Sequence, residues 1–364
     1  MNRGIMDKYA KTNDLIKDKI QDIFDPTTNE ITNRIYSYAY IDEQFFQKFD
    51  DFVNFAENEQ AFLKSKGFLL NEVHFYFTEN EEKDAFGGIQ YGLNQSEDLS
   101  LVTVSKGLIE RHIKYCDLIS SQLSKLIRKN RLPKDIKGKI DINDILGDLS
   151  LSDFLFLIGR DFVFNHEIAH VIQCEGKPRP VPGTNQIDSE NTARVKEDYS
   201  ERHHIGELDA DQFASRAMCK KVLNYYNNLP VEKKTRDNLA NLMAFALLGI
   251  YILFHILSNE MKSKFFFKNT KHPHQSIRMQ AIIQTVNETF GLYTPSGYIF
   301  NKHRMTSIFS NLSVQVTGSV ENFLAHINPK NISVKRQKDI SNYLDEMMQK
   351  TMELDWTLTK REIG

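Results

Sequence analysis

The sequence has few cysteines, and none of them is arranged to form a structural bridge or a cysteine-based metal site. Its three cysteines, Cys116, Cys174 and Cys219, are odd in number and widely spaced, with no CxxC pair. Small secreted proteins that depend on disulfides carry a denser framework of paired cysteines. The sequence therefore favours a protein of a reducing compartment.

The sequence also lacks a long uninterrupted apolar segment. The N-terminal stretch MNRGIMDKYAKTNDLIKDKI is polar and of mixed charge, so no signal peptide is expected there. The longest apolar run, LMAFALLGIYILF at residues 242–254, has 13 residues, whereas a membrane-spanning helix needs about 20. This run favours a buried core helix over a membrane segment, and the cytoplasm is the expected location.

The sequence also has no large excess of positive or negative charge. The formal net charge is -2 over 364 residues, so no overall basic field indicates binding to nucleic acid or to an anionic membrane surface. A content of 41% hydrophobic and 26% charged residues is that of an ordinary globular protein. The length allows one large domain or two modest ones, and nothing in the sequence sets the oligomeric state.

Periodic patterns predict an α+β, mostly helical fold with a small sheet. Four phenylalanines from Phe45 to Phe55 recur at helical spacing and predict a helix over 42–66, with Gly67 as its C-terminal cap. Three segments alternate like strands, and a Pro- and Gly-rich charged segment at 174–201 predicts a loop. The expected strands are 68–78, 85–93 and 99–105, and further helices are expected over 107–130, around 162–173, over 207–227 and 236–261, and within 302–364.

An H-E-x-x-H motif lies in the apolar stretch FVFNHEIAHVIQ, residues 162–173. Residues four apart lie on one face of a helix, so His166 and His170 can present two imidazole nitrogens to one ion. Glu167 lies about 100° further round the helix, where it can exchange a proton with a metal-bound water. The motif favours a zinc site, and two core histidines with local partners are the alternative.

A third ligand is visible in the segment GELDADQFASRAM, residues 206–218. Glu207 can complete a His-His-Glu site whose fourth position stays open, as a catalytic zinc requires. Asp211 lies one turn later and can accept the spare N–H of a ligand histidine. A solvated acidic helix start is the bland interpretation of this segment. His203 and His204 could replace Glu207 as ligands, and Cys174 is expected to be a buried thiol.

These blocks resemble the glutamate-ligand zinc metallopeptidases, the gluzincins, of the HtpX and CAAX-processing type. In that type an E-x-x-A-D helix follows H-E-x-x-H, here ELDAD, and a later H-P-x-x-x-x-R follows, here HPHQSIR. The order and spacing are most similar to the Lit-type phage-exclusion proteases, over residues 85–285. The resemblance implies a zincin-like core with a small antiparallel sheet, whose edge strand flanks the active-site helix.

The resemblance also implies roles for further residues. His272 would donate a hydrogen bond to the oxyanion, and Arg278 would pair with the acidic groups behind the metal. The edge strand is expected at LSLVTVS, with Leu101, Val102, Thr103 and Val104 binding an extended substrate. The catalytic domain is expected over 67–300, after an N-terminal helical segment at 1–66 and before a C-terminal helical extension at 301–364.

The function predicted from these residues is hydrolysis of peptide bonds in an intracellular protein, with one Zn²⁺ per chain and Glu167 as general base and acid. The Lit-type resemblance implies a host translation factor as substrate and a role in phage exclusion. The alternatives are a catalytically silent zinc-fold binding or sensor protein in phage defence or regulation, and a metal-dependent hydrolase of small molecules.

Overall fold

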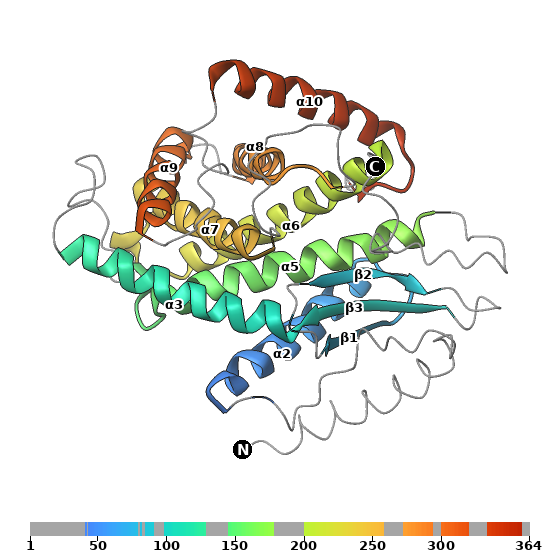
Figure 1. Ribbon diagram of the computed structural model, residues 1–364, viewed down its shortest axis with the longest axis horizontal. Helices are drawn as coiled ribbons and strands as arrows, with labels where there is room; N and C mark the ends of the chain where they lie inside the picture. Colours follow the sequence, from blue (N-terminus) through green and yellow to red (C-terminus); the bar gives the residue numbers. More distant parts are fainter. Residues whose placement is uncertain are drawn as a thin grey trace. The chain divides into compact units, whose positions relative to one another are not determined.

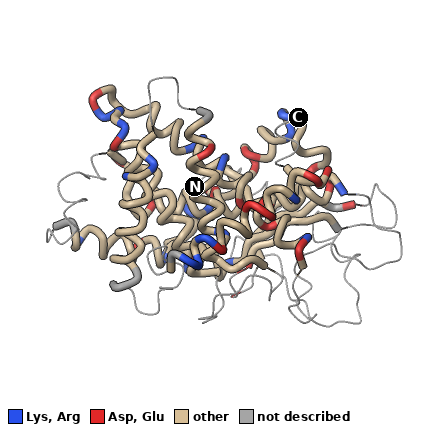
Figure 2. Tube along the Cα trace, turned by 90° about the horizontal axis from the view of Figure 1, so that it is seen from above, with Lys and Arg blue, Asp and Glu red and all other residues tan. Residues whose placement is uncertain are grey.

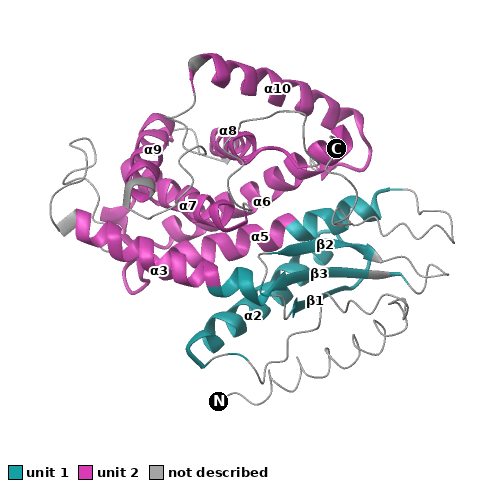
Figure 3. Ribbon diagram, viewed as in Figure 1, with its two compact units in different colours: residues 1–110, 167–194 teal, residues 111–166, 195–364 magenta. Residues whose placement is uncertain are grey.

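The computed structural model describes residues 41, 43–78, 81, 84–90, 98–128, 145–177, 200–257, 272–293, 300–319 and 333–358. The chain divides into two compact units (Figure 3). One comprises residues 1–110 and 167–194, and the other residues 111–166 and 195–364. The boundary crosses a single continuous helix, α5 (Leu151–Glu175), directly after His166.

The first unit is built from helix α2 (Glu43–Ser65), three strands, the start of α3 (Lys106–Arg128) and the end of α5. Three of the four phenylalanines of the predicted face of α2 are buried and Phe55 is half-buried. Phe49 and Phe52 pack edge-on against Phe77. Gly67 has a φ of 74°, the left-handed conformation expected where a helix ends. Aromatic packing between α2 and the sheet therefore forms the core of this unit.

The sheet is mixed, which corrects the expected antiparallel arrangement. Its order is β1 (Val73–Thr78), β3 (Leu99–Ser105), β2 (Ala85–Gln90), with β3 parallel to β1 and antiparallel to β2. The prediction that LSLVTVS is an edge strand is wrong, because β3 pairs on both sides. Among the described strands, β2 and β1 are the edges. The four residues proposed to bind substrate, Leu101, Val102, Thr103 and Val104, are buried in the central strand.

The second unit is helical (Figure 1). It holds most of α3 and α5. Gly249 on α7 (Arg236–Leu257) lets that helix approach α5 closely, since a Cβ added at Gly249 would lie 2.9 Å from the carbonyl oxygen of Leu155. The remaining elements of this unit are α6 (Glu201–Asn227), the short 3-10 helix η3 (Val231–Lys233), α7 (Arg236–Leu257), α8 (Gln275–Tyr293), α9 (Lys302–Ser319) and α10 (Val334–Glu353).

Helix α7 contains the apolar run that the sequence analysis singled out. It is the one helix in the described part of the chain that is long and apolar enough to cross a membrane, and 94% of its apolar window is buried within the structure. Burial to this extent is typical of a core helix, whose apolar side chains are covered by the rest of the protein.

The predicted fold class, α+β and mostly helical with a small sheet, is confirmed. Basic and acidic residues are both spread over the described chain (Figure 2), in keeping with the small net charge. Most of the predicted loop at 174–201 lies outside the described residues. The proposed domain boundaries at 66 and 300 stay a prediction.

Candidate metal centre

Helix α5 carries both histidines of the H-E-x-x-H motif. The helix is continuous from Leu151 to Glu175, so His166 and His170 lie one turn apart on the same face. Both imidazoles are buried. The ring of Phe162, one turn before His166, stacks nearly parallel to the imidazole with its centroid 6.2 Å away. Apolar neighbours on the helix therefore remove these two polar groups from water, as the motif's apolar setting predicts.

Helix α6 brings a carboxylate to the same place. Its N-terminus is capped by Ser200, whose hydroxyl accepts a hydrogen bond from the backbone N–H of His203. Glu207 is buried two turns into the helix, and its Oε2 lies 3.6 Å from Nε2 of His166. One ligand atom from each of His166, His170 and Glu207 lies within 4.8 Å of the other two. The structure thus brings together the three residues predicted to bind metal.

The donor set fits a zinc ion. Two neutral imidazoles and one carboxylate are a ligand set of catalytic zinc sites, which leaves the fourth position free. Bonds of about 2.0–2.1 Å in a tetrahedral arrangement separate neighbouring ligand atoms by about 3.3 Å, and the 3.6 Å between His166 and Glu207 is close to that separation. Because no other group of three such side chains occurs among the described residues, this is the metal-site candidate there.

Each of the two histidines has a polar neighbour at Nδ1, the ring nitrogen that faces away from the predicted metal position. Nδ1 of His166 lies 3.0 Å from Oδ1 of Asp211, and Nδ1 of His170 lies 2.9 Å from Oε1 of Gln173. An acceptor at Nδ1 favours the proton there and directs the Nε2 lone pair toward the other predicted ligands. At His166 this nitrogen also lies 3.3 Å from Nη2 of Arg278. Asp211 therefore lies where the sequence analysis placed it, behind a ligand histidine.

Arg278 of α8 joins the two carboxylates of α6. Its Nε and Nη2 donate to Asp211 at 2.8 and 2.7 Å, while Nη1 lies 2.9 Å from Oε2 of Glu207. The guanidinium also lies over the ring of Phe254, 4.8 Å from the centroid. A fork of donors paired with a buried carboxylate fixes both side chains in position. Arg278 thus pairs with the acidic groups, as the resemblance implies.

The charges of this cluster shift its proton equilibria. Burial by itself would lower the pKa of His166, but hydrogen bonds with Asp211 and Glu207 outweigh it and raise the pKa to about 8. Burial would raise the pKa of Asp211, but the charges and hydrogen bonds of Arg278 and His166 keep it below its ordinary value. The raised pKa favours the protonated form of His166, and a metal ion bound at this imidazole would have to displace that proton.

His272 lies directly before α8, at the open side of the cluster. Its side chain is 45% exposed, and Nδ1 lies 3.3 Å from Oε1 of Glu207. The structure therefore brings His272 to the predicted ligands, where it contacts the carboxylate of Glu207. A partly exposed imidazole beside a buried site can reach both the site and a bound substrate. Its predicted role toward an oxyanion stays a prediction.

Glu167 lies at the point where α5 meets the sheet of the first unit. Its side chain is largely buried. Gly87 of β2 lies directly against the backbone of Glu167, since a Cβ at Gly87 would collide with the main-chain carbonyl group of Glu167. A glycine inside a strand often marks such a close backbone approach. Strand β2, an edge of the described sheet, therefore runs beside the motif's glutamate, in the position predicted for 99–105.

The structure also resolves the alternatives for the metal ligands. His204 is fully buried and shares a hydrogen bond with the hydroxyl of Tyr343, and neither it nor His203 joins the metal cluster. Cys174 is buried, as expected for a structural thiol. Neither Gln173 nor Gly87 was predicted from the sequence. The GG pair in the predicted strand 85–93 could have indicated Gly87, and the spacing of three from His170 could have indicated Gln173.

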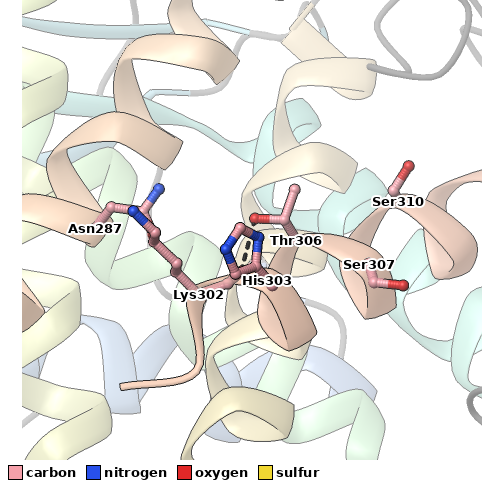
Figure 4. Close-up of a pocket in the computed structure, with 6 residues that line it drawn as sticks. All are labelled: Asn287, Lys302, His303, Thr306, Ser307 and Ser310. Carbon is pink, nitrogen blue, oxygen red and sulfur yellow. Dashed lines mark hydrogen bonds between the residues drawn. The ribbon is translucent and has the colours of Figure 1, made fainter. Parts of the chain in front are cut away.

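A pocket elsewhere in the second unit has no part in this cluster. It opens between α8 and α9 with a volume of about 440 Å³ (Figure 4). None of the residues that line this pocket is a predicted site residue, so the pocket is not a candidate for the catalytic site. The pocket is lined by Asn287, Lys302, His303, Thr306, Ser307 and Ser310.

Comparison with known protein families gives a match over the part of the chain that carries the cluster. Residues 148–291 match the model of a family described as Peptidase U49, a part that begins just before α5 and extends into α8. Searches of curated proteins and of solved structures return no match. The matched part is less than half of the chain, but it contains the whole His-His-Glu cluster. The match indicates a peptidase.

Proposed function

We propose that this protein is a zinc-dependent endopeptidase that hydrolyses peptide bonds of an intracellular protein in the cytoplasm. The observation that carries the proposal is the buried cluster of His166, His170 and Glu207, with Glu167 between the two histidines in the chain. The match to Peptidase U49 supports the same reaction class. A zincin-like core and a likeness to the Lit-type enzymes belong to the proposal.

The three ligands would hold the ion while their partners fix the geometry. When bound, zinc supplies a Lewis acid that polarises the peptide carbonyl and lowers the pKa of a coordinated water. Asp211 and Gln173 hold the two imidazoles with Nε2 toward the site. Arg278 compensates the negative charge of Glu207 and Asp211. These contacts preorganise the ligands, so little reorganisation is needed when the ion binds.

Glu167 would carry out the proton transfers. It accepts a proton from the attacking water and later donates it to the nitrogen of the leaving amine. Its position directly after His166 on α5 and the burial of its side chain support this role, because a buried carboxylate is screened from bulk water. His272, partly exposed beside Glu207, would donate a hydrogen bond to the oxygen that gains negative charge.

The substrate would lie along β2. An extended peptide can add to an unpaired strand edge through backbone hydrogen bonds. Among the described strands β2 pairs with β3 alone, and its Gly87 lies against the backbone of Glu167. A peptide bound at this edge would pass close to the proton-transferring carboxylate. This assignment replaces the central strand, whose Leu101 to Val104 are paired on both sides.

The experiment compares new protein N-termini in cells that express the wild type, Glu167→Gln, or Glu57→Gln as a control at an exposed glutamate of α2. Cleavage products should appear with the wild type and with Glu57→Gln, and be absent with Glu167→Gln, although this variant still binds zinc. A translation factor of the host cell is the first substrate to examine. Equal products from wild type and Glu167→Gln would contradict the proposal, and zinc binding without any product would favour a sensor protein.

A further inference from the structure

The C-terminal segment, residues 333–358, packs on the helix that carries Glu207. Figure 1 shows α10 running over α6 and α8, and the contacts are apolar at their centre. On α6 the contacting residues are Ile205 and Leu208, which flank Glu207 in the chain. A buried cluster joins the three helices, formed by Ile205, Leu208, Ile277, Ala281, Ile340, Tyr343, Leu344, Met347 and Trp356.

Two buried hydrogen bonds also join the C-terminal segment to α6. The fully buried imidazole of His204 bonds through Nδ1 to the hydroxyl of Tyr343. The carboxylate of Asp209 accepts a hydrogen bond of 2.8 Å from the backbone N–H of Leu358. Buried polar groups are costly to leave without a partner, so both bonds hold their groups at a defined geometry. The C-terminal segment therefore contacts α6 at points both before and after Glu207.

These two points lie on different sides of the helix. At about 100° per residue, His204 lies about 60° from Glu207 in angle, whereas Asp209 lies about 160° away. Two contacts at different angles resist rotation of the helix, in addition to the packing of α6 against α7 and α8. A carboxylate about 5–6 Å from the helix axis moves by about 2 Å when the helix rotates by 20°. Metal ligands tolerate deviations of only about 0.2 Å.

We propose that the C-terminal segment sets the rotation of α6, and that Tyr343 and His204 are positioning residues for the metal ligand Glu207. This inference rests on the proposed function, since it concerns the geometry of the proposed zinc site. The segment lies outside residues 148–291, the part that matches the peptidase family, whereas His204 lies inside it. Its hydrogen bonds to α6 are separate from those that Asp211 and Arg278 make inside the metal cluster.

The experiment uses the full chain and Co²⁺, whose visible absorption reports the coordination geometry of a site that takes zinc. Tyr343→Phe removes only the hydroxyl, and it should weaken Co²⁺ binding about tenfold, at the lower end of the effect of outer partners of metal ligands, and change the absorption spectrum. Ser333→Ala is the matched control, because it removes the N-terminal cap of α10 without touching α6. This control should lower the midpoint of chemical unfolding slightly and keep both the affinity and the spectrum.

A second pair of variants separates positioning from simple packing. His204→Asn keeps a hydrogen-bonding atom at the place of Nδ1, whereas His204→Leu fills the buried site with apolar volume. If His204 only packs, the Leu variant should be better in both stability and Co²⁺ affinity. The inference expects the opposite order for affinity, with Asn tighter than Leu, because only Asn keeps a partner for the hydroxyl of Tyr343.

The outcomes distinguish the two proposals. A wild-type chain that binds no Co²⁺ would overturn the proposed function. A wild-type chain that binds Co²⁺, together with wild-type affinity and spectra for Tyr343→Phe and His204→Leu, would overturn the positioning role alone. A Ser333→Ala variant that loses as much Co²⁺ affinity as Tyr343→Phe would also overturn the positioning role. The loss of affinity would then follow from the lower stability of α10.

Discussion

Replacing Asp211 by asparagine removes one negative charge from the centre of the buried cluster while keeping the side chain's size. Asp211 is fully buried and meets two N–H groups of Arg278, at 2.8 and 2.7 Å, and Nδ1 of His166 at 3.0 Å. Removing one partner of a buried ion pair typically costs about 3–5 kcal/mol, because the remaining charge loses its compensation. The metal-free Asp211→Asn protein should therefore be destabilised by an amount in this range.

The same substitution should weaken metal binding and change the proton equilibrium of His166. Loss of an outer partner of a ligand histidine lowers metal affinity about 10–100-fold, or about 1.4–2.8 kcal/mol. The pKa of His166, raised to about 8 in the wild type by Asp211 and Glu207, should fall because burial then opposes fewer hydrogen bonds. Zinc competition with a chromogenic chelator measures the affinity, and the NMR signal of the imidazole Cε1 proton, titrated without metal, measures the pKa.

A control variant is Asp237→Asn, which removes a carboxylate that is 53% exposed and lies 3.4 Å from Arg304. Exposed pairs contribute at most about 1 kcal/mol, so this variant should keep its zinc affinity and nearly all of its stability. Wild-type zinc affinity in Asp211→Asn, or an unchanged pKa of His166, would refute the reasoning that Asp211 orients this histidine.

Three further predictions follow from the same geometry. The pKa of His166 is higher in the folded metal-free protein than its ordinary 6.5. Protonated His166 therefore contributes about 2 kcal/mol to the free energy of unfolding below pH 6.5, and this contribution is lost as the pH rises through 8. Thermal melts should show this loss of stability in the absence of zinc and not in its presence. Glu207→Ala should lower the bound zinc measured by elemental analysis, and full occupancy would place the third ligand elsewhere. Gly87→Ala should destabilise the protein by about 1–3 kcal/mol through its collision with Glu167, whereas Gly291→Ala, with open space around it, should be neutral or stabilising by up to about 1 kcal/mol in chemical unfolding.

The parts of the metal centre that depend on local spacing could be predicted from the sequence. His166 and His170 share a face of α5 because four residues make about one helical turn, and Asp211 follows Glu207 at the same interval on α6. The carboxylate of Glu207 could be proposed only because the motif upstream called for a third ligand. Its meeting with His166 at 3.6 Å is a tertiary contact that no local pattern contains.

The order of the strands could not be predicted in the same way. Alternation indicates that 99–105 is a strand, but which strands pair with it depends on packing between distant segments. The residues of β3 from Ser100 to Ser105 are all buried, which is the pattern of a central strand covered on both faces. The bond between His204 and Tyr343 joins residues 139 apart in the sequence, so no spacing rule could have indicated it.

The most direct measurement of the metal centre is X-ray absorption spectroscopy of the zinc-loaded protein, combined with the metal content of the His166→Ala variant. One zinc ion per chain is expected, bound by two imidazoles and oxygen at about 2.0–2.2 Å, without the sulfur ligand that would lie at about 2.3 Å. Zinc binding should fall sharply in His166→Ala. A sulfur ligand, or full zinc occupancy after the loss of His166, would contradict a centre built from His166, His170 and Glu207.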